Sequence, residues 1–253
     1  MQAPAVALRG VRKSFDGGKK FVLDGIDLEI PRGQLTIIIG YSGTGKSVLL
    51  KHVLGLIHPT EGRVQVLGND VNEMRPRELI RFRTRLGVLF QHVALFDDMT
   101  ALENVCFPLR EHKPDLRPEK IVEIGIDKLK QAGFDRQHYG KYPNELSSGM
   151  LKRVGLARAL ALDPEILLYD EPTTGLDPIL TEMVDNLILD THRQQKNSTG
   201  IVVTHDLAAA FKIGDYIVML DKGRVLLSGR PEDFLSSNEE LVQRFIEKGY
   251  KKS

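Results

Sequence analysis

The sequence predicts an α/β protein with a parallel-sheet core. The apolar run at residues 35–39 leads into the glycine-rich stretch 40–47 and then into a helical pattern. A similar unit occurs later, where the helical pattern of residues 181–194 separates the strand-like runs 166–169 and 201–204. Strands that are joined through helices in this way usually lie parallel in one sheet. We therefore expect a parallel core whose loops gather at one edge.

The stretch 40–47 reads Gly-Tyr-Ser-Gly-Thr-Gly-Lys-Ser and has the spacing of a phosphate-binding loop. Its glycines let the backbone curl so that amide groups point inward, and the following helix adds the partial positive charge of its N-terminus. Lys46 would reach the β- and γ-phosphates of a nucleoside triphosphate, and the Ser47 hydroxyl would be a ligand of Mg²⁺. A plain glycine-rich turn is the alternative. The predicted nucleotide-binding residues are Gly40, Tyr41, Ser42, Gly43, Thr44, Gly45, Lys46 and Ser47.

The composition is that of an ordinary globular protein, with 42% hydrophobic and 27% charged residues. The formal net charge of +1 gives no electrostatic reason to expect a nucleic-acid partner. A single cysteine, Cys106, excludes an internal disulfide and a cysteine-rich zinc site, and we expect it to be buried. The N-terminus lacks a signal-peptide pattern, and no apolar run reaches the ~18–20 residues that cross a bilayer. At a membrane, such a chain would act as a peripheral subunit.

The first part of the chain is predicted to be rich in strands. β-Structure is expected over residues 5–30, with a turn at Gly17-Gly18, and again at residues 63–67 and 86–90. Residues 75–85 have an amphipathic helical pattern with an arginine-rich face. A nucleic-acid or lipid-headgroup patch is one interpretation of that face. A solvated helix face is favoured, because the whole chain is nearly neutral.

The rest of the chain alternates between helical and strand patterns. Residues 92–162 are predicted to form a helical insertion whose helices are broken by prolines, namely Pro108, Pro114, Pro118 and Pro143. Residues 216–227 have the pattern of a hairpin. A last helix is expected over residues 237–248, with Gly249 as its C-cap.

Two adjacent carboxylates complete the predicted site. Asp170 and Glu171 follow the apolar run 166–169, so they are expected at the edge of the sheet where ligands bind. Asp170 would hold the metal, directly or through water, and Glu171 would polarise the attacking water. Many strands end in a charged turn, so the two acids alone are weak evidence. Their occurrence together with the phosphate-binding loop is what favours the functional interpretation.

Further short segments then occur in a characteristic order. Residues 146–150, Leu-Ser-Ser-Gly-Met, open a helix with an apolar face. The other segments are Phe15, Gln91, Gly175-Leu176-Asp177, and His205 after the strand-like run 201–204. Together they resemble the motifs of ATP-binding cassette (ABC) ATPases, and the resemblance covers about residues 6–234. It implies a single cassette domain: a nucleotide core with an antiparallel β flank over 1–91 and 163–235, a helical subdomain over 92–162 and a C-terminal helix over 236–253.

The resemblance implies a role for each of these residues. Two subunits would sandwich two ATP molecules, with Ser147, Ser148 and Gly149 of one subunit facing the nucleotide of the other. Phe15 would stack on adenine and Asp177 would belong to the nucleotide site. Glu171, His205 and Gln91 would be catalytic, and the metal ligands would be Ser47, Gln91 and Asp170. Taken alone, each has a plainer structural interpretation, such as a helix cap for Ser147 or Asp177.

The helical segment beginning with Leu146 departs from the usual family pattern at two places. Ser148 replaces the first glycine of the LSGGQ motif and Met150 replaces its final glutamine. We expect the contact with the γ-phosphate to survive, because serine is small. The contact would weaken if position 148 required a left-handed backbone. Gly175, where serine or alanine is common, is expected to be harmless.

Residues 89–112 indicate a branch of the family. This stretch looks like the ATPase of Mla-type, MCE-associated phospholipid transport systems. The segments that carry the resemblance are Ala-Leu-Phe, Asp-Met-Thr, Asn-Val and Pro-Leu-Arg-Glu-His. That resemblance implies a homodimer on an integral permease, at the cytoplasmic face of a bacterial inner membrane. A periplasmic MCE-domain protein and phospholipid cargo would complete the system. The alternatives are the ATPase of a polar amino-acid or other small-solute importer and, third, a nucleotide-dependent switch with poor turnover.

Overall fold

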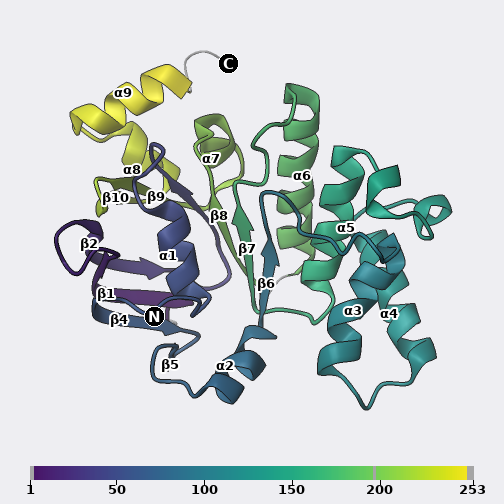
Figure 1. Ribbon diagram of the computed structural model, residues 1–253. Coiled ribbons are helices and arrows are strands. Elements are labelled where there is room, and N and C mark those ends of the chain that lie inside the picture. The colour runs from purple at the N-terminus through teal and green to yellow at the C-terminus, as the bar shows by residue number, and fades with distance from the viewer. Residues whose placement is uncertain (1–2, 196–197, 250–253) are drawn as a thin grey trace. The chain divides into compact units, whose positions relative to one another are not determined.

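The structure is a computed structural model that describes residues 3–195 and 198–249. The chain divides into two compact units. Unit 1 comprises Met1–Ile80 and Asn197–Ser253, and unit 2 comprises Arg81–Lys196. Figure 1 labels the strands and helices that belong to each.

An antiparallel sheet in unit 1 has the strand order β2-β1-β4-β5. These strands are β1 (Val6–Ser14), β2 (Phe21–Ile30), β4 (Glu61–Val66) and β5 (Asn69–Asp70). In the second half of β2, buried aliphatic residues alternate with exposed acids, as a sheet with one solvated face requires. The predicted β flank is therefore present, with the expected turn between β1 and β2.

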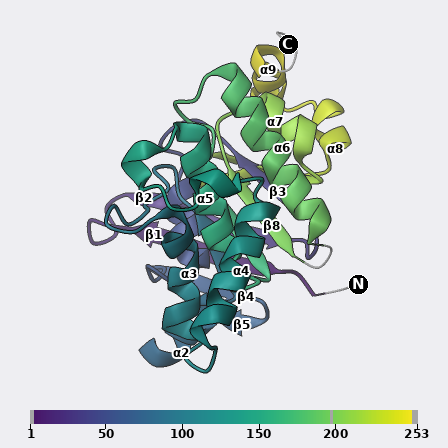
Figure 2. The same ribbon diagram turned by 90° about the vertical axis from the view of Figure 1, so that its right-hand side faces the viewer.

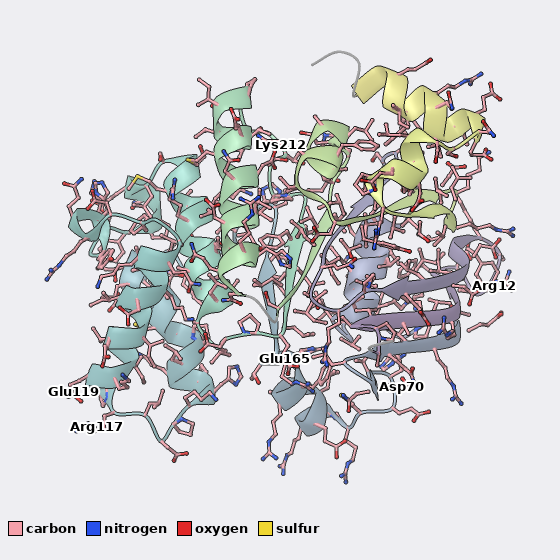
Figure 3. The ribbon with its side chains drawn as sticks, turned by 180° about the vertical axis from the view of Figure 1, so that it is seen from behind. Arg12, Asp70, Arg117, Glu119, Glu165 and Lys212 are labelled. Carbon is pink, nitrogen blue, oxygen red and sulfur yellow. The ribbon has the colours of Figure 1, made fainter. Side chains whose placement is uncertain are left out.

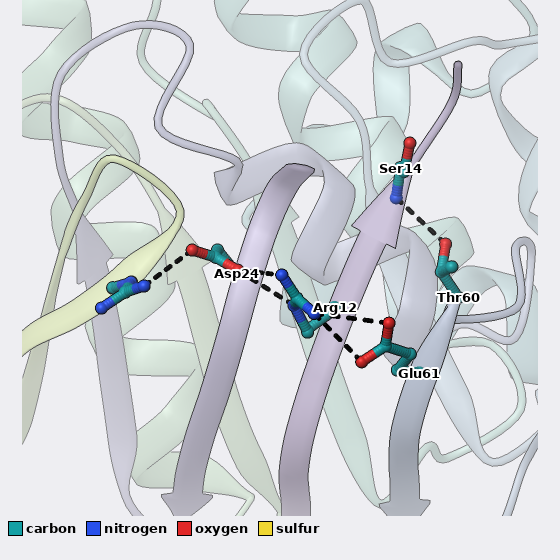
Figure 4. Close-up of polar contacts among 6 residues, drawn as sticks. Arg12, Ser14, Asp24, Thr60 and Glu61 are labelled. Carbon is teal, nitrogen blue, oxygen red and sulfur yellow. Dashed lines mark hydrogen bonds and ion pairs between the residues drawn. The ribbon is translucent and has the colours of Figure 1, made fainter. Parts of the chain in front are cut away.

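Charged side chains tie this flank together and connect it to β10 (Arg224–Gly229). Arg12 Nε donates to Asp24 Oδ1 at 3.0 Å, and Arg12 Nη1 lies 3.2 Å from Glu61 Oε2 (Figure 4). Arg224 Nη2 donates to the other Asp24 oxygen at 2.8 Å. The two guanidinium groups, Arg224 first and then Arg12, lower the pKa of Asp24. Asp24 thus joins strands from two parts of unit 1.

The strands around the phosphate-binding loop have the order β10-β9-β3-β8. β3 (Leu35–Ile39) lies between β8 (Thr199–Val203) and β9 (Tyr216–Asp221) and is parallel to both. Every residue of β3 and β8 is buried, which is why both are rich in aliphatic residues and do not alternate between apolar and polar ones. β10 returns antiparallel to β9 and confirms the predicted hairpin. The helices of this unit are α1 (Lys46–Val53), α7 (Leu207–Ile213), α8 (Pro231–Leu235) and α9 (Glu240–Gly249).

Unit 2 contains a parallel strand pair and a group of helices. β6 (Leu86–Leu89) pairs with β7 (Ile166–Asp170). The helices are α3 (Ala101–His112), α4 (Pro118–Gln131), α5 (Ser148–Leu160) and α6 (Pro178–Gln194), with short 3₁₀ turns at Arg136–His138 and Pro143–Glu145. α3 packs against α4 and α5, and the three lie side by side in Figures 1 and 2. α2 (Pro76–Arg83) spans the boundary between the units.

α3 and α4 pack closely at Cys106. A Cβ atom added at Gly125 would lie 2.5 Å from Cys106 Sγ, so only glycine allows this approach. Cys106 is fully buried, as expected, and its burial raises the pKa of the thiol. α4 itself begins after Arg117 and carries Glu119 in its first turn, where Figure 3 labels both side chains. An acid at this position interacts favourably with the helix dipole.

The structure corrects several local expectations. Pro108 does not break its helix but lies inside α3, because packing on α4 and α5 outweighs the local cost of a proline. Gly249 belongs to α9 instead of capping it. α6 starts at Pro178, three residues before the expected start, since Asp177 caps it. No pattern predicted β5, α7 or α8, each of which has seven residues or fewer.

Candidate active site

The phosphate-binding loop connects β3 to α1, and its shape depends on glycine. Gly43 and Gly45 have left-handed backbones, with φ of 82° and 102°. A Cβ atom at Gly40 would lie 2.5 Å from the carbonyl oxygen of Leu220, and one at Gly45 would lie 2.6 Å from Leu23 Cδ2. Space around Gly43 is open. Two of the glycines are thus required by close packing as well as by the curl of the loop.

Lys46 lies inside the curl. Its side chain is buried, and Nζ donates to the carbonyl oxygens of Gly40 at 2.8 Å and Tyr41 at 3.2 Å. Thr44 Oγ1 also donates to the Tyr41 carbonyl, at 2.9 Å. The loop therefore wraps around a cation at the N-terminal end of α1, an arrangement that suits phosphate oxygens. Ser47 is exposed in the first turn of α1, where its hydroxyl could reach a metal.

Phe15 and His205 belong to unit 1, as the loop does. Phe15 follows β1, and 63% of its surface is exposed, so its ring offers a platform on which a base could stack. Lys13 Nζ lies 5.1 Å from the centre of the ring. His205 follows β8, whose Val203 is in register with Ile38 of β3. Because parallel strands end at the same edge, His205 lies at the loop's end of the sheet, as predicted.

In unit 2, Asp170 ends β7 and Glu171 follows it. Glu171 has a φ of 47°, a left-handed backbone that a non-glycine residue adopts at a cost in free energy. Thr174 Oγ1 donates to Glu171 Oε2 at 2.9 Å and orients the carboxylate. Strain of this kind is concentrated at functional sites, which supports the catalytic role predicted for Glu171.

Gln91 lies at the same edge as Glu171. Leu89 at the end of β6 is in register with Tyr169 of β7, and Gln91 and Glu171 each come two residues later. The backbone carbonyl of Gln91 accepts a hydrogen bond from Lys152 Nζ at 2.7 Å. The structure thus places Gln91, predicted to bind the metal, and Glu171, predicted to act on water, at the same edge of this strand pair.

The predicted γ-phosphate contacts lie at the start of α5. Ser147 is the N-cap, and its hydroxyl accepts from the Met150 amide at 3.4 Å. Ser148 is the first helical residue, and its φ is not positive, so serine fits there without strain. Gly149 is buried, and a Cβ atom there would lie 2.9 Å from Met183 Cε. The serine at position 148 therefore leaves the start of this helix intact.

Asp177 has a clear structural role. Its Oδ1 atom accepts from the amides of Ile179 and Leu180, both at 3.0 Å, and so caps α6. The preceding Gly175 has a φ of 79°, a conformation that favours glycine over the serine or alanine common at this place. The contact of Asp177 with nucleotide stays a prediction.

The predicted residues fall into two sets. Unit 1 holds Phe15, the loop 40–47 and His205, while unit 2 holds the remainder: Gln91, Ser147, Ser148, Gly149, Asp170, Glu171 and Asp177. The residues fit the groups that they are expected to bind. The loop is a cation-lined concavity for phosphate, and Ser47, Gln91 and Asp170 offer the hydroxyl, amide and carboxylate oxygens that Mg²⁺ prefers. Among the described residues, no helix has the length and apolar character to cross a membrane.

Two contacts at the site were not predicted. The first joins Lys152 to Gln91, and the second joins the rings of Tyr41 and Phe245. Lys152 shares a helix face with Leu156, which is four residues further on and fully buried. A lysine on the apolar face of a predicted helix is the sequence feature that could have indicated this buried charge. Nothing in the sequence links Tyr41 to Phe245.

The chain is similar in sequence to known proteins. The family model described as ABC transporter matches residues 23–174. A probable ribonucleotide transport ATP-binding protein from Mycobacterium leprae is 41% identical over 96% of this chain and 68% of its own length. An intermembrane phospholipid transport system ATP-binding protein from Haemophilus influenzae is 38% identical over 92% of this chain and 87% of its own. A methionine import ATP-binding protein from Enterococcus faecalis is 37% identical over 96% and 70%.

A solved structure has the same fold. It is a dimeric post-hydrolysis state of an ATP-binding cassette bound to ADP and Pi, and it aligns with a TM-score of 0.80 and 34% identity. The alignment covers 89% of this chain and 98% of that one. This likeness confirms the predicted fold class, an α/β nucleotide core with an antiparallel flank and a helical insertion.

Proposed function

We propose that this chain, which belongs to the ABC transporter family and is an ATPase, powers the movement of phospholipid between the inner and outer membranes of a bacterium. Membership of the family rests on the match of residues 23–174 and on relatives that are 37% to 41% identical. The likeness to a post-hydrolysis cassette supports ATP hydrolysis as the reaction. The names of the relatives give three different cargoes: ribonucleotide, phospholipid and methionine. The identity of the cargo is therefore the part of the function that we propose.

One observation carries the choice of phospholipid. The phospholipid transport relative matches 92% of this chain and 87% of its own length at 38% identity. The segment 89–112 adds support, because its sequence resembles the Mla-type ATPases. Its helical part starts at a capping box, in which Thr100 Oγ1 accepts from the Glu103 amide and Glu103 Oε2 accepts from the Thr100 amide. The box fixes where the helix begins, so the segment would present a constant surface to a permease.

The chain's residues share the work of binding ATP. Phe15 stacks on adenine, and the loop 40–47 with Lys46 binds the phosphates. In a homodimer, Ser147 and Gly149 of one subunit complete the nucleotide site of the other, using the start of α5 as an anion site. The solved cassette that this chain resembles is dimeric, which supports this arrangement.

The remaining residues position the metal and the water. Ser47, Gln91 and Asp170 would hold Mg²⁺, which when bound would neutralise phosphate charge. Glu171 orients the attacking water and His205 contacts the γ-phosphate. Catalysis in this class consists mainly of positioning and electrostatic stabilisation. A glutamate oriented by Thr174 at 2.9 Å fits that task.

The proposed setting follows from the cargo. The homodimer binds an integral permease at the cytoplasmic face of the inner membrane, and a periplasmic MCE-domain protein carries lipid onward. A small-solute importer is the second candidate, and the methionine import relative at 37% identity favours it. In that case a soluble binding protein would replace the MCE-domain protein.

Purification of the intact complex tests the proposal. We would isolate the tagged chain from its own membranes in mild detergent and identify the proteins and lipids that accompany it. Recovery of a small permease, an MCE-domain protein and phospholipid is the expected result. A solute permease recovered with a soluble binding protein would replace phospholipid transport by import. Absence of any membrane protein would contradict both.

A further inference from the structure

The segment Gln91–Ala94, which follows β6, has an unusual backbone. Val93 and Ala94 have φ of 58° and 52°, so two consecutive non-glycine residues are left-handed. Val93 is β-branched, and left-handed conformations are especially unfavourable for such residues. A backbone of this kind persists only where surrounding contacts hold it. Helix α5 supplies those contacts.

Three residues of α5 contact this segment. Arg158 Nη2 donates to the Val93 carbonyl at 2.6 Å, and Nη1 donates to the Ala94 carbonyl at 2.7 Å. Lys152 Nζ donates to the Gln91 carbonyl at 2.7 Å. Between them, Gly155 lets the helix approach so closely that a Cβ atom there would lie 2.3 Å from Val93 Cγ1. Gly155 is three positions from Lys152 and three from Arg158, so it adjoins both on the helix surface, and the three residues contact one segment.

Lys152 is placed at a cost in free energy. Only 4% of its surface is exposed, and within the part of the chain that the structure describes no carboxylate forms an ion pair with it. Burial lowers the pKa of its amine. A buried cation without a counter-ion is unfavourable for folding, and a methionine would fill the same space without that cost. The lysine is therefore better explained by its hydrogen bond to the Gln91 carbonyl than by a contribution to stability.

We propose that Lys152 is a positioning residue for ATP hydrolysis, which fixes the Gln91 backbone relative to the helix that begins at Ser147. The proposal rests on the metal-binding role given to Gln91 and on the nucleotide contact given to Ser147 under "Proposed function". Through this bond, the residue that binds magnesium in one site and the helix that completes the other site of the dimer move as one body. Arg158 holds the rest of the segment in the same way.

The test compares variants of the full-length protein in its transporter complex. Lys152→Met removes the donor, Lys152→Arg keeps it, and Gln91→Ala removes the side chain that is positioned. Arg153→Met is the matched control, because Arg153 is the neighbouring cation on α5 and donates instead to the carbonyls of Ala132 and Gly133. For each we would measure kcat, the Mg²⁺ concentration that gives half-maximal hydrolysis, and ATP binding in EDTA.

Lys152→Met is expected to lower kcat about tenfold and to raise the half-maximal Mg²⁺ concentration, while ATP binding in EDTA stays unchanged. Lys152→Arg should restore most of the rate, and Arg153→Met should leave the Mg²⁺ dependence at its wild-type value. In the Gln91→Ala background, Lys152→Met should cause little further loss, since both act through one residue.

Three results would overturn the inference. Losses that multiply in the double variant would mean that Lys152 does not act through Gln91. An equal Mg²⁺ shift in Arg153→Met would mean that any weakening of α5 has the same effect. A wild-type rate and Mg²⁺ dependence in Gln91→Ala alone would instead remove the metal-binding role of Gln91, and the inference would fail with its premise.

Discussion

Tyr41 of the phosphate-binding loop packs edge-to-face against Phe245 of the C-terminal helix α9, with ring centres 4.9 Å apart and an interplanar angle of 89°. Phe245 is 6% exposed, and Val242, one turn earlier on α9, is fully buried. Edge-to-face aromatic pairs of this geometry are favourable. A helix far along the chain thus supports the loop that binds phosphate.

Phe245→Ala should therefore weaken both stability and nucleotide binding. Loss of the buried ring is expected to cost about 3 kcal/mol of unfolding free energy, and ATP affinity should fall because Tyr41 loses its support. Denaturant unfolding and equilibrium ATP titration measure the two effects. Arg244→Ala is the control, since Arg244 is an exposed neighbour on α9 that pairs with Glu240. Unchanged ATP affinity in Phe245→Ala would show that the contact does not support the loop.

Glu171→Gln should separate binding from hydrolysis. Glutamine keeps the shape of the side chain and an acceptor for Thr174 Oγ1, but it cannot take a proton from water. ATP binding should persist while the rate of phosphate release falls by about 100-fold or more. Equal phosphate release by the variant and the wild type, both at background, would favour the switch that binds ATP without turnover.

Gly45→Ala and Gly43→Ala form a matched pair in the phosphate-binding loop. Both glycines are left-handed, so an alanine at either costs about 1–2 kcal/mol of strain. At Gly45 the added Cβ would also lie 2.6 Å from Leu23 Cδ2, whereas the space at Gly43 is open. ATP affinity should fall much further in Gly45→Ala. Equal losses would mean that backbone conformation alone decides the effect.

Asn104→Ala should destabilise unit 2 by about 3 kcal/mol. Asn104 is fully buried, accepts from the Phe96 amide at 2.8 Å, and donates to the carbonyls of Phe96, Met99 and Thr100 at 3.0–3.1 Å. Alanine would remove the side-chain partner of these part-buried backbone groups. Urea unfolding measures the loss, and the exposed Asn144→Ala is the control. A loss no larger than that of Asn144→Ala would contradict the structure.

Cys106 should make stability fall at alkaline pH. Burial raises the pKa of its thiol, so the unfolded chain loses this proton near pH 8.5 while the folded protein still keeps it. Because the folded state then binds more protons, the free energy of unfolding decreases as pH rises above about 8.5. Cys106→Ala should lack this component. Parallel stability curves of the two proteins between pH 7.5 and 9.5, about the window that matters, would contradict it.

Much of the fold could be predicted because buried strands leave a strong local pattern. β3 and β8 are rich in isoleucine, valine and leucine, and the structure buries every residue in them, the threonines Thr36 and Thr199 included. The sequence also predicts that Gln91 and Glu171 each follow a strand, whereas the register that places both at one edge is seen only in the structure. The position of a buried strand depends on residues that are neighbours in the chain, so it can be predicted from the sequence.

Long-range packing could not be predicted in the same way. Lys152 and Gln91 are 61 positions apart, and no local pattern joins them. Pro108 reads as a helix breaker, yet the packing of α3 on two other helices keeps it helical. The left-handed backbone at Glu171 likewise has no sequence signal, because glutamate rarely adopts it.

The most direct test of the central claim is ATP-dependent transfer of a labelled phospholipid. It would use vesicles that hold the complete transporter purified with this chain, and Glu171→Gln would be the inactive control. We predict transfer that requires ATP and is lost in Glu171→Gln, with no accumulation of labelled methionine. ATP hydrolysis with methionine uptake and no movement of lipid would contradict the account.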